Sequence, residues 1–205
     1  MMVQVNRKLH KVHAKRFEAI GENITSMKIL QLGDPLLEKK SKIVKNIKEL
    51  GVQNLIKQML KILNKDVDKT AGLAAPQLGK LLNIIICRRV DLEIDEDDKN
   101  VVWEVMINPR ITKKSKTKTV AWEGCLSVQN GNIFGEVIRP EKISVVFFDK
   151  YGKKKSLNAN DYLAHVVQHE IDHLNGILFV KYVQDPDSLL TLDELEQLSK
   201  KEAGR

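Results

Sequence analysis

One stretch of this chain, residues 160–176, reads NDYLAHVVQHEIDHLNG. Its composition predicts a helix from about 160 to 175, with Asn158 or Asn160 as the N-terminal cap and Gly176 as the terminator. Apolar side chains recur along the segment, namely Leu163, Ala164, Val166 and Val167. We therefore expect a helix that is at least half buried.

Two histidines of this segment, His169 and His173, are four residues apart. Side chains at positions i and i+4 of a helix point the same way, so both imidazoles can bind one metal ion. Glu170 follows the first histidine directly and can reach a water on that metal as a general base. The alternative is a pair of surface histidines on an ordinary helix, which the apolar neighbours disfavour.

The third ligand of such a site is not decided by spacing alone. A catalytic zinc-type site needs three protein ligands and an open position for water. One large group of peptidases places a histidine six residues past the second one, but Phe179 stands there in this chain. Other peptidases use a glutamate farther downstream, for which Glu194 and Glu196 are candidates. Upstream, Cys125 offers a thiolate, and the glycine and serine near it suit a ligand better than a packed strand.

The composition is that of one ordinary globular domain. The chain has 205 residues, of which 42% are hydrophobic and 30% are charged. No apolar run approaches the ~18 residues of a membrane span, so we expect no membrane partner. Cys87 lies in the apolar run NIIIC and is expected to be a core residue. Two cysteines cannot form a disulfide framework, which favours a reducing compartment.

The net charge of +7 does not by itself indicate a nucleic-acid partner. Aromatic residues make up only 5% of the chain and no basic stripe contains them, which argues against a sequence-specific nucleic-acid reader. Residues 1–26 hold five basic residues against two acidic ones. We interpret them as a basic N-terminal extension. An organellar targeting segment is the alternative, which is disfavoured because Ser26 is the only serine there.

The remaining patterns predict an α+β fold. It is a single domain of antiparallel β-sheets packed around a central metal-binding helix, with N-terminal and C-terminal helices. The acidic block at 91–98 is expected to be a solvated loop. The expected elements are a helix within 46–66, strands at 83–87, 101–107, around 110–121 and at 142–148, and a final leucine-patterned helix at 188–203.

Three segments together resemble the signature motifs of peptide deformylases. They are GLAAPQ at 72–77, EGCLS at 123–127 and QHEIDHLNG at 168–176. Their order and separations fit the family over about residues 27–183. The resemblance implies a cytoplasmic metal-dependent hydrolase with a catalytic domain at 27–205. Such an enzyme removes the N-formyl group from the N-terminal methionine of newly made polypeptides and releases formate.

The resemblance also implies a role for each matching residue. One divalent metal ion is held by Cys125, His169 and His173, with Fe2+ as the native ion and Zn2+, Ni2+ or Co2+ as alternatives. Glu170 takes the proton from the attacking water, and the Gln77 side-chain amide with the Leu126 backbone N–H stabilises the oxyanion. Substrate-binding positions are Gly72, Gly124, His165 and Val166. A supporting ion pair is expected between Glu123 and Arg139.

Several positions depart from the family pattern. Thr70 replaces a glycine of the first motif, and Gln129 with Asn130 changes the rim after the cysteine motif. His165 lies one helical turn before His169, where family members usually have an apolar wall for the methionine side chain. We expect it to be a pocket-wall residue, so that an isoleucine there improves turnover if the imidazole obstructs the pocket. Direct metal ligation by His165 is geometrically awkward.

The expected partners are N-formylmethionyl nascent peptides. Proximity to the ribosome is plausible, but residues 185–205 hold six acidic residues against three basic ones, which is no strong docking signal. Two other functions are alternatives: a zinc peptidase with a downstream ligand, which would not need Cys125, and a binding module that has lost catalysis. The presence of Glu170 and Gln77 disfavours the binding module.

Overall fold

The computed structural model describes residues 3–5, 28–65, 67, 70–92 and 101–203. Most of the basic N-terminal extension and most of the acidic block at 91–98 therefore lie outside the described residues. Within the described part of the chain, no helix is both long and apolar enough to cross a membrane.

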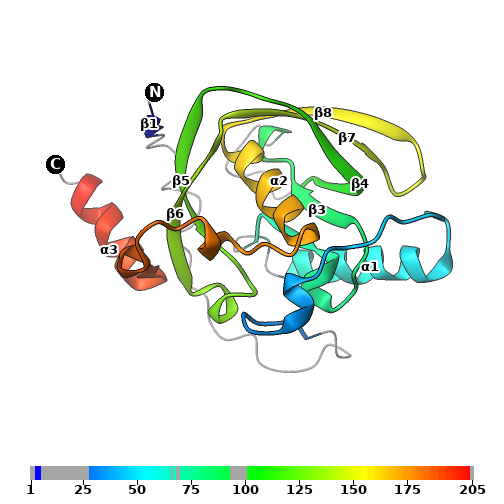
Figure 1. Cartoon of the computed structure of the whole chain (residues 1–205), viewed down its shortest axis with the longest axis horizontal. Coiled ribbons are helices and arrows are strands. Elements are labelled where there is room, and N and C mark those ends of the chain that lie inside the picture. Colours follow the sequence, from blue (N-terminus) through cyan, green and yellow to red (C-terminus); the bar gives the residue numbers. More distant parts are fainter. Residues whose placement is uncertain (1–2, 6–27, 66, 68–69, 93–100, 204–205) are drawn as a thin grey trace.

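The larger of the two sheets has five strands in the order β2-β3-β4-β7-β8, and every neighbouring pair is antiparallel (Figure 1). Side chains alternate along β7 and β8, so that Ile143 lies opposite Ala159 on the buried face while Lys142 faces Asn160 on the other. The strands are β2 (Gly72–Ala74), β3 (Ile84–Arg88), β4 (Trp103–Lys114), β7 (Lys142–Phe148) and β8 (Lys154–Asn160).

The smaller sheet has four strands in the order β1-β5-β6-β9. Its centre is the long antiparallel pair of β5 (Lys118–Gly124) and β6 (Ile133–Pro140), with β9 (Leu190–Thr191) at one edge. At the other edge, β1 (Val3–Val5) runs parallel to β5, which departs from the expected antiparallel arrangement.

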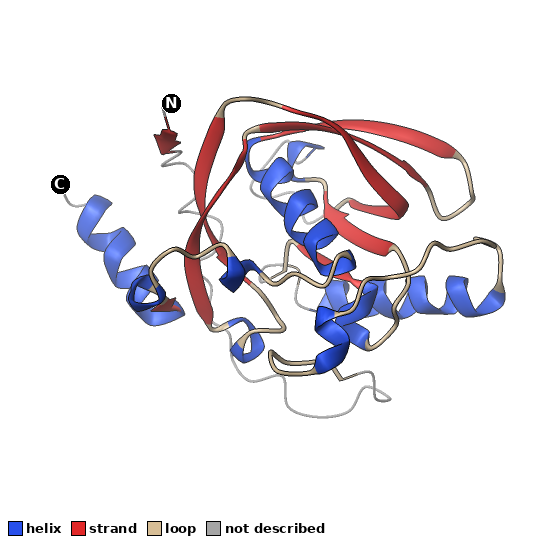
Figure 2. Cartoon of the chain, viewed as in Figure 1, coloured by secondary structure: helices blue, strands red, loops and turns tan. Residues whose placement is uncertain are grey.

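Helix α2 (Asp161–Leu174) lies in the middle of the molecule, with strands on more than one side of it (Figure 2). Its apolar side chains share one core cluster with residues of β3, β4 and β7, including Ile85, Met106 and Val145. The other two helices are α1 (Leu50–Lys65) and α3 (Leu192–Ala203). The expected α+β fold around a central helix is therefore confirmed.

Helix α2 begins where it was predicted, but without the expected capping hydrogen bond. Asn160 does occupy the N-cap position, but its side chain makes no capping hydrogen bond, and the first helical residue, Asp161, has a positive φ of 48°. The C-terminus follows the prediction, because Asn175 caps the helix and Gly176 has a φ of +74°. One expected strand, around 110–121, is interrupted at 115–117, where the chain turns from β4 into β5.

The leucine pattern near the C-terminus is explained by packing within the chain. Leu192 and Leu195 of α3 form a buried cluster with Phe134 of β6, and Trp122 packs against it. Leu192 and Leu195 of the pattern are therefore core residues, while Leu189 and Leu198 are only partly buried. The strands β1, β2, β6, β8 and β9 were not anticipated from the sequence.

We predict that Gly176→Ala destabilises the fold by about 2 kcal/mol or more, because two penalties coincide. The residue has a left-handed φ, and an added Cβ would clash with the Glu38 carbonyl oxygen. Gly152→Ala is the matched control, since Gly152 has a φ of +87° and an added Cβ there would have nothing within 4 Å. Thermal unfolding of both variants should show the larger loss for Gly176→Ala; equal losses would contradict the steric part of the argument.

Candidate metal centre

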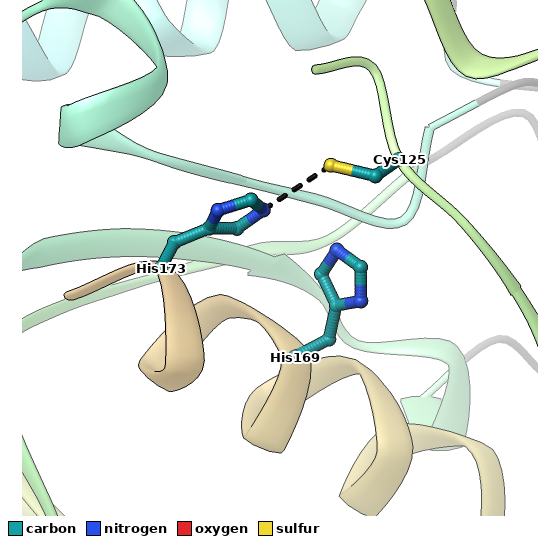
Figure 3. Close-up of side chains that lie close together, drawn as sticks. All are labelled: Cys125, His169 and His173. Carbon is teal, nitrogen blue, oxygen red and sulfur yellow. Dashed lines mark hydrogen bonds between the residues drawn. The ribbon is translucent and has the colours of Figure 1, made fainter. Parts of the chain in front are cut away.

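Three potential ligands, two from α2 and one from the loop after β5, lie close together (Figure 3). Cys125 directly follows β5, and His169 and His173 project from successive turns of α2. Their donor atoms all lie within 4.8 Å of one another, and the Cys125 Sγ is 3.2 Å from the His173 Nε2. In the described part of the chain this is the only group of three or more such residues that could hold a metal ion.

The donor set fits a divalent metal of the iron or zinc type, which accepts one thiolate and two imidazoles. The Nδ1 of His169 donates to Glu123 Oε2 at 2.9 Å, which leaves Nε2 as its available donor atom. The Nε2 of His173 faces the thiol, and its Nδ1 is buried without a hydrogen-bond partner. Burial lowers the pKa of His173 well below its ordinary value, which favours the neutral imidazole that binds metals.

Glu123 is a buried hydrogen-bond acceptor for side chains from two elements. Arg139 of β6 donates to both carboxylate oxygens, at 2.5 and 2.9 Å, so the expected ion pair is present. His169 and His165 of α2 donate to one oxygen each, at 2.9 and 3.3 Å. Burial acts to raise the pKa of Glu123, but these hydrogen bonds hold that pKa well below its ordinary value.

Gln77 is held so that its amide nitrogen points at the cysteine. It lies in the short 3-10 helix Ala75–Leu78, and its Oε1 accepts from the Ala74 backbone N–H at 2.8 Å. This fixes which end of the amide is the donor: Nε2 lies 3.1 Å from Ser127 Oγ and 3.5 Å from Cys125 Sγ. A second N–H, from the Ser127 backbone, lies 3.4 Å from the same sulfur.

Glu170 is buried next to the ligands and one of its oxygens, Oε2, has no hydrogen-bond partner. Burial raises its pKa to about 7, the range in which a carboxyl group can both accept and return a proton. The carboxylate packs directly on Gly72, where an added Cβ would lie 2.6 Å from Oε1. A side chain at position 72 would therefore collide with Glu170, while the Gly72 backbone still lines the pocket.

A pocket opens onto this centre between β2, β5 and α2. The residues expected to bind substrate or stabilise the oxyanion all line it, namely Gly72, Gly124, His165, Val166, Gln77 and Leu126. Thr70 and Tyr162 line it as well. Phe134 packs so closely on Gly124 that an added Cβ would meet its ring at 2.5 Å.

The altered rim of the pocket has a supporting residue that sequence reasoning missed. Gln129 and Asn130 both have left-handed backbones, with φ of 47° and 55°. Gln31 holds this turn, because its Oε1 accepts from the Asn130 backbone N–H and its Nε2 donates to the Leu126 carbonyl. Gln31 and Asn130 are 99 residues apart, so no local pattern could have revealed the contact.

The ligands expected for the peptidase alternative do not reach the centre. Glu194 is exposed and accepts hydrogen bonds from the Thr191 backbone and hydroxyl at 2.7 Å each. Glu196 lies in α3 beyond it, and neither belongs to the group around Cys125. His165 is also outside that group, since its ring nitrogens face Thr119 and Glu123.

Comparison with known proteins agrees with the resemblance of the three sequence motifs. Residues 26–188 match the family model described as polypeptide deformylase. A peptide deformylase of Microchaete diplosiphon is 40% identical over 170 residues, covering 82% of each chain, and one of Synechocystis is 37% identical, covering 77% of this chain and 79% of the relative.

Solved structures agree with these relatives. A peptide deformylase from Synechococcus elongatus, solved in complex with actinonin, superposes with a TM-score of 0.70 at 32% identity, covering 88% of this chain and 91% of the other. A probable peptide deformylase from Synechococcus phage S-SSM7 gives 0.66 at 42% identity, covering 77% of this chain and 99% of the other.

We predict that Arg139→Met lowers the free energy of unfolding by about 3–5 kcal/mol, because it leaves the Glu123 charge buried without its ion-pair partner. The double variant Glu123→Gln, Arg139→Met should recover part of that loss, since the deeply buried Glu123 charge is removed together with its partner and only the more exposed Asp172 loses an ion pair. Urea unfolding of the metal-free proteins measures both. A double variant less stable than Arg139→Met alone would contradict this explanation.

We predict that Gly72→Ala lowers kcat for hydrolysis of a formylated peptide by about 100-fold, because the new methyl displaces the Glu170 carboxylate. A loss of about this size is the lower range for removal of a positioned proton-transfer group. Metal content should stay unchanged, since the three atoms nearest to that methyl all belong to Glu170 rather than to a metal ligand. Gly51→Ala, on the surface of α1, is the control and should retain the wild-type rate. Wild-type kcat in Gly72→Ala would contradict the prediction.

Proposed function

Because this chain belongs to the peptide deformylase family, we propose that the pocket beside Cys125, His169 and His173 is its catalytic site. The chain is a metal-dependent hydrolase that removes the N-formyl group from newly made polypeptides. The observation that carries the assignment is the meeting of a Cys-His-His donor set with a buried glutamate that has an unpartnered oxygen, beside a pocket lined by Cys125, His169 and Glu170.

The three ligands would hold one divalent ion, and we propose Fe2+ as the native one. The thiolate and two imidazoles also accept Zn2+, Ni2+ or Co2+. When bound, the ion lowers the pKa of a water molecule and polarises the formyl oxygen. Glu123 supports this arrangement through the Nδ1 of His169, which it keeps as a hydrogen-bond donor.

Glu170 is the proton carrier of the proposed reaction. Its unpartnered Oε2 accepts a proton from the water that attacks the formyl carbon. The same oxygen delivers that proton to the amide nitrogen as the C–N bond breaks, which leaves formate and a peptide with a free N-terminal amine. Its pKa of about 7 suits both transfers near neutral pH.

The oxyanion that develops on the formyl group needs donors already in place. We assign this role to the Gln77 Nε2 and the backbone N–H of Leu126. The support for Gln77 is that its other amide atom is fixed by Ala74, so that reorientation is not needed during the reaction. Both residues line the pocket next to Cys125.

The substrate would lie along the backbone at Gly72 and Gly124, with the methionine side chain against Val166 and His165. The partners we propose are N-formylmethionyl nascent peptides, with the enzyme working near the ribosome in the cytoplasm. We assign the catalytic domain to residues 27–205 and regard residues 1–26 as an extension. A sequence-specific nucleic-acid partner is not part of the proposal.

The decisive experiment measures formate release from formyl-Met-Ala-Ser by anaerobically purified protein, together with its metal content. Glu170→Gln, which keeps the shape but cannot carry the proton, should lose activity at least 100-fold while the metal remains bound. Cys125→Ala should lose both metal and activity. A Glu170→Gln variant that works at the wild-type rate would overturn the assignment of the proton carrier.

A further inference from the structure

His165 occupies the pocket wall one helical turn before the metal ligand His169, and it is almost completely buried at 2% exposure. Both of its ring nitrogens have partners. Nδ1 lies 3.3 Å from Glu123 Oε1 and Nε2 lies 2.9 Å from Thr119 Oγ1. A carboxylate only accepts, so Nδ1 donates to Glu123, and in the neutral ring Nε2 accepts from the Thr119 hydroxyl. The tautomer of His165 follows from this pairing.

The two histidines share one carboxylate. His165 donates to Glu123 Oε1 and His169 donates to Glu123 Oε2, so that successive turns of α2 hold the two oxygens of the same group. Arg139 donates to both oxygens from the opposite strand. Any rotation of the Glu123 carboxylate must therefore disturb His165 and His169 together.

We propose that His165 is a positioning residue, which fixes the imidazole of His169 through Glu123 and so couples the wall of the substrate pocket to the metal ligand. The proposal rests on the catalytic site described above. It also reverses the expectation from the sequence: an isoleucine at this position would remove a donor from Glu123 and leave the buried Thr119 hydroxyl unpaired, so turnover should fall rather than improve.

Two substitutions of His165 by amide residues, asparagine and glutamine, test its two hydrogen bonds one at a time. The Nδ2 of an asparagine can replace Nδ1 of the imidazole and still donate to Glu123. The side-chain amide of a glutamine instead reaches the position of Nε2 and can pair with Thr119. His165→Asn therefore keeps the contact that the proposal needs, whereas His165→Gln keeps only the other contact.

The first test measures how fast Co2+ leaves the loaded protein to a chelator, followed by the absorption of the cobalt–thiolate chromophore. Loss of a group that orients a metal ligand typically costs about 10- to 100-fold in metal affinity. We expect His165→Gln to release Co2+ about 10-fold faster than wild type, and His165→Asn to stay within about 3-fold of it. Equal rates in both variants, or faster release by His165→Asn, would overturn the proposal.

Two further measurements distinguish a positioning role of His165 from a general loss of stability. Thermal unfolding of the metal-free variants should show similar midpoints for the Asn and Gln variants, because each loses one hydrogen bond of His165. The product peptide Met-Ala-Ser should raise the equilibrium affinity for Co2+ by a larger factor in wild type than in His165→Gln, since coupling between two sites acts reciprocally on their binding free energies. An identical factor in both would mean that the peptide only covers the metal, and would overturn the coupling.

The expected ranking of wild type, His165→Asn and His165→Gln by their rates of Co2+ release does not depend on which residue carries the proton. If Glu170→Gln kept the wild-type rate of formate release, the catalytic assignment would fail while the cobalt experiment could still succeed. If instead His165→Gln held Co2+ as tightly as wild type while Glu170→Gln was inactive, the coupling would fail and the catalytic assignment would stand.

Discussion

The Glu123 carboxylate accepts hydrogen bonds from Arg139 on the neighbouring strand and from two histidines on the central helix. Burying a carboxylate without partners would cost several kcal/mol, so the charge is tolerable only when sheet and helix are docked together. Arg139 extends the connection, because its Nη1 also binds Asp172 of α2 at 2.6 Å. The same hydrogen bonds of Glu123 therefore dock α2 on the β5–β6 pair and orient the metal ligand His169.

The tight approach of α2 to its surroundings depends on positions without a side chain. Gly72 leaves room for the Glu170 carboxylate, and Gly176 lets the end of the helix turn beneath the Glu38 carbonyl. The first contact sets the position of Glu170, which we propose as the proton carrier, and the second sets the direction in which the chain leaves the helix. Glycine is thus needed at these two points for close packing and, at Gly176, also for a left-handed backbone.

The sequence predicted the central helix, the three metal-binding candidates and the ion pair of Glu123, because each depends on short spacings or on motifs. It did not predict β8, an edge strand of mostly polar residues in which the apolar alternation is limited to Leu157 and Ala159. It also missed Thr119 and Gln31, since each acts on a residue 46 or more positions away. Such contacts are set by how the sheets and helix pack, and leave no local pattern.

The example of His165 shows that the residue type alone does not determine how polar a pocket wall is. A histidine in a pocket wall suggests a polar wall, yet both ring nitrogens here are occupied by Thr119 and Glu123, so the ring offers the pocket mainly its carbon atoms. The cost of burying its polar atoms is offset within the protein, and an apolar substrate side chain need not compete for them. Because the same hydrogen bond also holds Glu123, the shape of the pocket and the orientation of His169 cannot be varied independently in this chain.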